Sequence, residues 1–189
     1  MIWIVYLNVF LSSYRRQHQP SILITSGAGR GMKSHCFVTN LGLEPVYLLD
    51  IILDVRIADG RSFRAIIPER NERHRDDEDG DARIATNVGP LVSGEEKDIG
   101  RFSILIDRAC EENPDLDCHM DFVGVKVTVV TVTASRASLY GAERDYVLET
   151  CNRGIVRLRP TTFKARQIDG FFGRRSLAKM LNAELSSSV

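Results

Sequence analysis

Apolar residues fill most of the first fourteen positions, Met1 to Tyr14 (MIWIVYLNVFLSSY), and the run stops at Arg15 and Arg16. A helix without a polar face is typical of a segment that contacts lipid or is wholly buried. At 1.5 Å per residue fourteen residues reach about 21 Å, short of the roughly 30 Å hydrocarbon core of a bilayer. We therefore expect a half-span or interfacial helix, or a helix whose apolar part continues upstream. The alternative is a core helix of a soluble protein.

Aromatic and basic side chains around this run indicate how it would meet a membrane. Trp3, Tyr6 and Tyr14 suit the two bilayer interfaces, where amphipathic rings are enriched. Arg15 and Arg16 follow the apolar run and would lie among the headgroups of the cytoplasmic leaflet. A secretory signal peptide carries its positive charge before the apolar run, so that interpretation does not fit. These residues predict a single-pass membrane anchor with the rest of the chain on the cytoplasmic side.

Beyond Pro20 the pattern changes to short apolar runs and period-2 alternation, which is typical of strands. The clearest alternation, Phe122 to Thr133, predicts one face toward a core and one wetter face. Asp59-Gly60 is a tight-turn pair that predicts a hairpin over residues 51–67. The predicted strands are residues 21–25, 35–39, 46–57, 62–67, 99–106, 122–133 and 145–149, with 155–158 as a further candidate.

The order of these segments indicates the fold class. No helix of crossover length separates the predicted strands, so a parallel sheet is not expected. Short strands and frequent turns favour a mainly β fold, an antiparallel immunoglobulin- or fibronectin-like β-sandwich. We expect a membrane-anchor helix and basic juxtamembrane segment at 1–19, the sandwich domain at 20–165, and an amphipathic helix with a disordered tail at 166–189.

The tail holds the second predicted helix, Asp169 to Leu185. Its apolar residues recur at the spacing i, i+3, i+4, i+8, as one face of a helix requires, and they are Leu177, Met180, Leu181 and Leu185. Asp169 is a suitable N-cap residue. Arg174, Arg175 and Lys179 accompany the apolar stripe, so the predicted helix is amphipathic and basic.

Charge excludes one class of partner. The chain has 25 basic and 25 acidic residues, so its net charge gives no field that would attract nucleic acid. The charges are nevertheless separated along the chain. Residues 69–81 hold seven acids and three arginines, whereas residues 153–179 hold eight basic residues and one acid. RNA binding would also require aromatic side chains interleaved with the basic ones, and these are missing.

The basic third of the chain suggests a contact surface. Arg157 and Arg159 alternate with apolar neighbours, which places both guanidinium groups on one strand face. With Arg174, Arg175 and Lys179 they are candidates for contact with anionic lipid headgroups or with a partner protein. The alternative is that the tail helix packs on the sandwich and the charges are only solvated.

Two loops invite a ligand interpretation that their spacing does not support. The glycine-rich stretch at 26–34 (SGAGRGMKS) lacks the glycine that a phosphate-binding loop places before its lysine, and a strand rather than a helix follows. We interpret it as a hairpin loop. Aligning Gly80 with the sixth place of a calcium loop leaves Arg75 and Thr86 at two ligand positions. We interpret that acidic loop as solvated, and we expect no cofactor.

An alternative hypothesis, a metal-binding protein or an enzyme, rests on cysteine and histidine residues. Cys110, Cys118 and His119 supply ligand types that zinc prefers, but no CxxC pair supports a site. The neighbours His35 and Cys36 point to opposite faces of a strand and rarely chelate one ion. Reduced thiols are expected in a cytoplasmic domain, whereas periplasmic exposure would favour a disulfide between Cys110 and Cys118.

The order of features resembles a group of small proteins from alphaproteobacteria in which a transmembrane helix precedes one β-sandwich domain. The segments that carry the resemblance cover most of the chain and are IWIVYLNVFLSSYRRQ, GAGRGMKSHCFVTNLGLEPVYLLDII, YGAERDYVL and RLRPTTFKARQI. Their motifs are structural, so the resemblance implies a bacterial inner-membrane location and a fuller upstream span but no activity.

We therefore predict a membrane-anchored binding or scaffolding module without enzymatic activity, an accessory subunit of an inner-membrane complex. Its expected partners are the lipid bilayer and another membrane or cytoplasmic protein. The alternative hypothesis is a soluble or peripheral metal-binding protein or enzyme that uses Cys110, Cys118 and His119.

Overall fold

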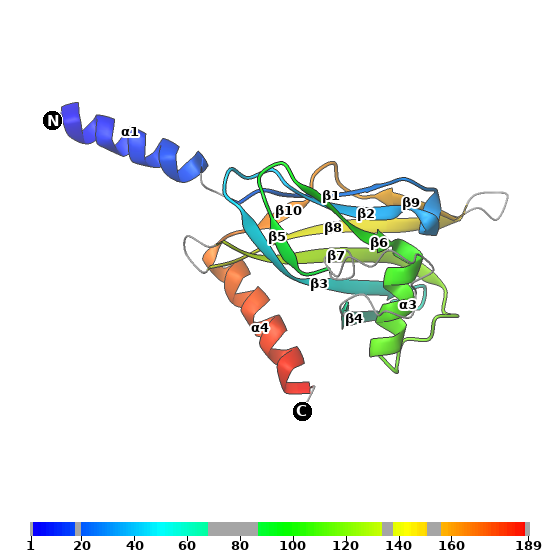
Figure 1. Cartoon of the computed structure of the whole chain (residues 1–189). Helices are drawn as coiled ribbons and strands as arrows, with labels where there is room; N and C mark the ends of the chain where they lie inside the picture. Colours follow the sequence, from blue (N-terminus) through cyan, green and yellow to red (C-terminus); the bar gives the residue numbers. More distant parts are fainter. Residues whose placement is uncertain (1, 18–19, 68–86, 134–137, 151–155, 188–189) are drawn as a thin grey trace.

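Two antiparallel sheets and three longer helices make up the computed structural model, which describes residues 2–17, 20–67, 87–133, 138–150 and 156–187 (Figure 1). The helices are α1 (Ile2–Gln17), α3 (Phe102–Glu112) and α4 (Phe171–Ser187), with a 3₁₀ turn, η1 (Gly31–Lys33). The strands are β1 (Ile22–Gly27), β2 (His35–Asn40), β3 (Val46–Ile57), β4 (Ser62–Ile66), β5 (Gly89–Leu91), β6 (Glu96–Arg101), β7 (Phe122–Thr133), β8 (Leu139–Thr150), β9 (Val156–Pro160) and β10 (Arg166–Ile168).

The two sheets form the layers of a sandwich. One contains three strands in the order β1-β2-β6, and the other contains seven, with β10-β8-β7-β3-β4 as its main path. Period-2 alternation explains the core: Leu53 and Val127 face inward from the large sheet, and Ile24 and Val38 meet them from the small one. The prediction of a mainly β, sandwich-like fold is confirmed.

The outer face of the large sheet is polar over much of its area. Asp54 of β3 is hydrogen-bonded and ion-paired to Arg64 of β4 at 2.6 Å, and it lies 3.1 Å from the ammonium group of Lys126 on β7. Arg56 and Asp145 form a further pair at 3.2 Å across the same face. Because cross-strand neighbours share a face, these ion pairs mark the wetter side that the alternation predicted.

A helix replaces one predicted strand. Residues 99–106 were expected to continue as a strand, but β6 ends at Arg101 and α3 begins at Phe102. The buried residues of α3 follow helical spacing and are Phe102, Leu105, Ile106 and Ala109. Gly100, with a φ of +115°, interrupts extended backbone just before the helix. The strand prediction for residues 102–106 is therefore wrong, because a short apolar run fits both periodicities.

The tail helix is present and packs on the outer face of the large sheet. Leu177 of α4 is fully buried and forms a cluster with Ile52 and Val130. Met180 and Leu181 pack against that cluster, as the helical spacing predicted. The preceding strand β10 pairs with β8, so the sheet continues past residue 165, where the sandwich was expected to end.

Strand pairing assigns the loops to two ends of the sandwich. Ile22 pairs with Asn40, and Val46 pairs with Leu91, so the starts of β1 and β3 lie beside the ends of β2 and β5. We call this the proximal end, because α1 precedes β1 there; it comprises residues 20–22, 40–46, 91–96 and 168–172. Figure 1 shows α1, the loop after β2 and the start of α4 at this end, with α3 and η1 at the other, distal end.

Candidate functional site

Helix α1 exposes apolar side chains on all sides. Trp3 is 83% exposed and Tyr6 is 71% exposed, and the other large exposed side chains of this helix are Ile4, Val5, Leu7, Val9 and Phe10. In Figure 1 the helix lies apart from the sheets. The exposure excludes, for the described part of α1, the core-helix interpretation, because a core helix buries such side chains within its own domain.

Helix α1 is short. Its 16 residues correspond to about 24 Å of helix. Among the described residues, no helix is both long and apolar enough to cross a bilayer. Tyr14, Arg15 and Arg16 lie in the last turn of α1, and their side chains are outside what the structure describes.

Further apolar side chains are exposed at the proximal end. Leu41 and Leu43 lie in the loop between β2 and β3, and Val92 lies in the loop between β5 and β6. The loops are held together by backbone hydrogen bonds, in which Gly94 donates to the carbonyl of Asn40 and Leu41 donates to that of Ser21. Three exposed apolar side chains therefore lie close to the point where α1 joins the domain.

Two aromatic residues at the start of α4 extend this exposed set. Phe171 is 67% exposed and Phe172 is 84% exposed, and their rings meet edge to face with centroids 5.6 Å apart. Sequence reasoning missed both residues. The signal was the pair of phenylalanines one glycine before Arg174 and Arg175. The two phenylalanines do not belong to the i, i+3, i+4 stripe that faces the sheet.

The predicted basic residues fall into two groups. Arg157 and Arg159 are exposed on β9, which pairs with the distal half of β8, and Arg159 is ion-paired with Glu149 at 3.3 Å. Arg159 is opposite Val147, six residues along β8 from Gly141, where α4 packs, so about 20 Å separates the two groups. The structure thus does not bring all five predicted residues together.

The basic residues of α4 are themselves divided. The guanidinium carbon of Arg174 lies 5.6 Å from the ring centre of Tyr140, which is buried in the sheet. This cation–π contact holds Arg174 against the domain. Arg175 and Lys179 are exposed, whereas Arg174 is half-buried. Arg175 and Lys179 are therefore the more accessible basic residues of this group.

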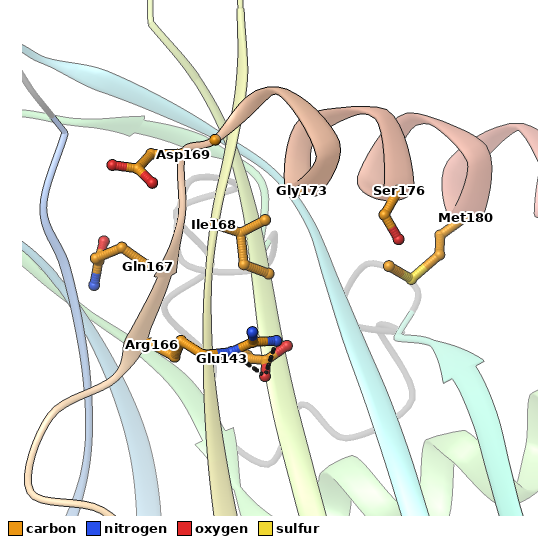
Figure 2. A pocket seen from close by; sticks show the side chains of 9 residues that line it. Glu143, Arg166, Gln167, Ile168, Asp169, Gly173, Ser176 and Met180 are labelled. Carbon is orange, nitrogen blue, oxygen red and sulfur yellow. Dashed lines mark hydrogen bonds and ion pairs between the residues drawn. The ribbon is translucent and has the colours of Figure 1, made fainter.

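A small cavity lies between α4 and the edge of the large sheet (Figure 2). Its volume is about 230 Å³, and β8, β10, the turn after β10 and α4 line it. At its edge Arg166 donates to Glu143 from Nε at 2.8 Å and from Nη2 at 2.6 Å. Figure 2 shows Ser176 and Met180 pointing from α4 toward the sheet. The cavity thus has an ion pair on one side and apolar packing on the other.

His35 on the small sheet contacts Asp98 and Arg101 through its two ring nitrogens, and these contacts were not predicted. Nδ1 of His35 lies 2.6 Å from Asp98 Oδ2, and Nε of Arg101 donates to Nε2 of His35 at 3.2 Å. Both ring nitrogens are therefore engaged. Cys36 beside it faces the core, where burial raises the pKa of its thiol well above the ordinary value.

The thiols of Cys110 and Cys118 lie close together at the end of α3 and the loop that follows. Burial, with a side-chain hydrogen bond to Cys118 as a second cause, raises the pKa of Cys110 to about 12. Both are free cysteines. The backbone N–H of His119 donates to Asp117, and its side chain is exposed. Within the described residues no group of three or more metal-ligating side chains gathers. The acidic loop at 69–81 lies outside them.

No protein-family model, curated protein or solved structure matches this chain. The resemblance to alphaproteobacterial membrane proteins remains a prediction.

Proposed function

We propose that this protein is a membrane-attached β-sandwich module that binds a partner protein and does not catalyse a reaction. The observation that carries the proposal is helix α1, whose apolar side chains from Trp3 to Phe10 are exposed on every side. A protein groove covers one face of a helix, whereas the acyl layer of a bilayer can surround all faces. We also propose that the sandwich is of the immunoglobulin- or fibronectin-like type.

The described part of α1 is short compared with the thickness of a bilayer. A helix of about 24 Å cannot by itself cross a hydrocarbon core of roughly 30 Å. Arg15 and Arg16 follow the apolar part, and positive charge at that place favours the cytoplasmic side. We infer a location on the cytoplasmic face of a bacterial inner membrane.

Fractionation of cells that express the full chain tests the attachment. The wild-type protein is expected in the membrane fraction after a wash with high salt, because apolar contact is not screened by ions. The variant V5D/F10D is expected in the soluble fraction. Full-length wild-type protein in the soluble fraction would remove the attachment claim. Protease added to inside-out vesicles should digest the domain, and digestion only in right-side-out vesicles would reverse the orientation.

The distal arginines fit a protein partner better than a membrane. With the proximal end at the bilayer, Arg157 and Arg159 lie about 20 Å farther along β8. This separation exceeds the Debye length of about 8 Å at physiological ionic strength, so headgroups attract them little. An acidic surface on a membrane-complex subunit is the matching partner class.

Charge reversal at the two ends tests that assignment. In mild detergent R157E/R159E should lose subunits that co-purify with the wild-type protein, and it should stay in the membrane fraction. R175E/K179E is the matched control with the same charge change at the other end, and it should keep those subunits. Equal loss of the subunits in both variants would contradict a distal partner surface.

One observation favours the alternative function. The thiols of Cys110 and Cys118 are hydrogen-bonded to each other, so two sulfur atoms of the kind that bind zinc lie close together. Elemental analysis of the purified wild-type protein and of C118A tests a metal-binding role. An equimolar transition metal in the wild type that is lost in C118A would establish this alternative.

A further inference from the structure

We propose that the exposed side of α4 is a second membrane-contact surface, which inserts Phe171 and Phe172 into an anionic bilayer and pairs Arg175 and Lys179 with its headgroups. This inference rests on the proposed attachment through α1. We call Phe171, Phe172, Arg175 and Lys179 the lipid-facing stripe. Contact through α1 and through this stripe would fix the orientation of the domain on the membrane.

The stripe follows from helix geometry. At 3.6 residues per turn Phe171, Arg175, Lys179 and Phe172 lie within about 100° of one another around the helix axis. Leu177, which is buried on the sheet, lies on the opposite side. The contact of α4 with the domain therefore presents these four residues outward as one surface.

The composition of the stripe fits lipid rather than water. The two phenylalanine rings are 67% and 84% exposed, although most large apolar side chains of the domain are buried. The cations Arg175 and Lys179 are exposed and follow them along the same side of the helix. Aromatic rings below the headgroups with cations beside them are typical of interfacial helices.

The position of the stripe matches the attachment helix. The start of α4 lies at the proximal end, where α1 joins the domain and where Leu41, Leu43 and Val92 are exposed. Gln167, shortly before α4, accepts a hydrogen bond from the backbone N–H of Ile22 at 3.0 Å, which ties the start of α4 to the start of β1. A bilayer that contains α1 therefore lies near the end of the domain at which α4 starts.

Tethering makes even a weak second contact effective. Each basic residue near an anionic surface contributes on the order of 1 kcal/mol, and attachment through α1 keeps the stripe at a high effective concentration near the lipid. Phe163 offers a matched comparison, because it is 100% exposed in the loop between β9 and β10, beside the middle of β8. The proximal position and the neighbouring cations distinguish the stripe from Phe163.

Tryptophan fluorescence with brominated lipids tests the inference on the full chain. Trp3 is the only tryptophan, so the wild-type protein reports on α1, W3F/F172W reports on the stripe, and W3F/F163W is the control. The vesicles contain brominated phosphatidylcholine and phosphatidylglycerol. Vesicles should shift the emission of W3F/F172W to shorter wavelength and quench it, as they do for the wild type, and should leave W3F/F163W unchanged.

The outcomes separate this inference from the proposed function. Quenching of the wild type without quenching of W3F/F172W would overturn the second contact and leave the attachment intact. Absence of quenching in the wild type would overturn the attachment. A blue shift of W3F/F172W without vesicles would indicate a protein contact and would also overturn the inference. In R175Q/K179Q the preference for anionic over neutral vesicles should fall by up to about 30-fold.

Discussion

Leu177 of α4 packs directly over Gly141 of β8, and a Cβ built on Gly141 would lie 2.8 Å from Cδ1 of Leu177. The same Cβ would lie 3.1 Å from the carbonyl oxygen of Val129. A side chain at position 141 would therefore push against both the helix and the neighbouring strand. This contact fixes how α4 lies on the sheet and which of its residues face outward.

We expect Gly141→Val to destabilise the protein by about 1–3 kcal/mol, because it overpacks this contact. Leu177→Ala should cost about 2–5 kcal/mol through the cavity that it leaves. Urea unfolding followed by circular dichroism measures both. Gly170→Ala is the control, because nothing lies within 4 Å of a Cβ at that glycine. Equal stability of Gly141→Val and the wild type would contradict the packing described.

Asp54 joins two strands on the outer face through its ion pairs with Arg64 and Lys126. Its side chain is 9% exposed, so Asp54→Asn leaves two cations with a weaker acceptor at a poorly solvated place. The expected loss of unfolding free energy is about 1–3 kcal/mol. The control is Asp59→Asn. The carboxylate of Asp59 pairs locally with Arg61 in an exposed turn, so this substitution should change stability little. Similar losses in the two variants would show that the Asp54 pairs contribute no more than a surface pair.

Asp50 predicts a pH dependence of stability. Partial burial raises the pKa of its carboxyl group above the ordinary value of 3.8. Because the folded-state pKa is the higher one, the stability from this group is fully present below pH 3.8 and is lost as the pH rises through the folded-state pKa. At pH 7 Asp50→Asn should raise the melting temperature by about 1–2 °C. The gain should shrink as the pH falls toward 4, and a gain that is independent of pH would contradict the ionisation argument.

The two thiols at α3 should differ in reactivity. Cys118 is exposed, whereas Cys110 is partly buried and its pKa is raised to about 12 by burial and by the hydrogen bond to Cys118. At pH 8 few Cys110 side chains are thiolates, so iodoacetamide should modify Cys118 first. Mass spectrometry of peptides over time measures the two rates. Substitution of Cys118 by Ser should not make Cys110 as reactive as Cys118 is in the wild type, because burial remains. Faster modification of Cys110 would contradict its placement.

Strong alternation made two strands predictable to the residue. Val46–Ile57 and Phe122–Thr133 have the bounds that the sequence indicated, because β-branched residues in long runs leave no helical alternative. Phe102–Ile106 failed for the opposite reason: five residues cannot distinguish a strand from the first turns of a helix, and contact with the core decided between them.

The candidate surface depends on tertiary contacts that single-chain patterns do not contain. The apolar helix at the N-terminus and the stripe of Leu177, Met180 and Leu181 were visible as periodicities. The outward position of Phe171 and Phe172 depends on where Leu177 packs, which only the sheet defines. The pairing of His35 with Asp98 likewise arises from the register of β2 and β6, which shifts between Cys36 and Phe37.

Vesicle flotation of the purified full chain tests the membrane attachment most directly. With phosphatidylcholine and phosphatidylglycerol vesicles the wild-type protein should float to the top of a density gradient, and V5D/F10D should stay at the bottom. The control is V92D, which adds one negative charge at the proximal end but outside α1 and should still float. Wild-type protein that remains at the bottom, with its fold intact by circular dichroism, would contradict attachment through α1.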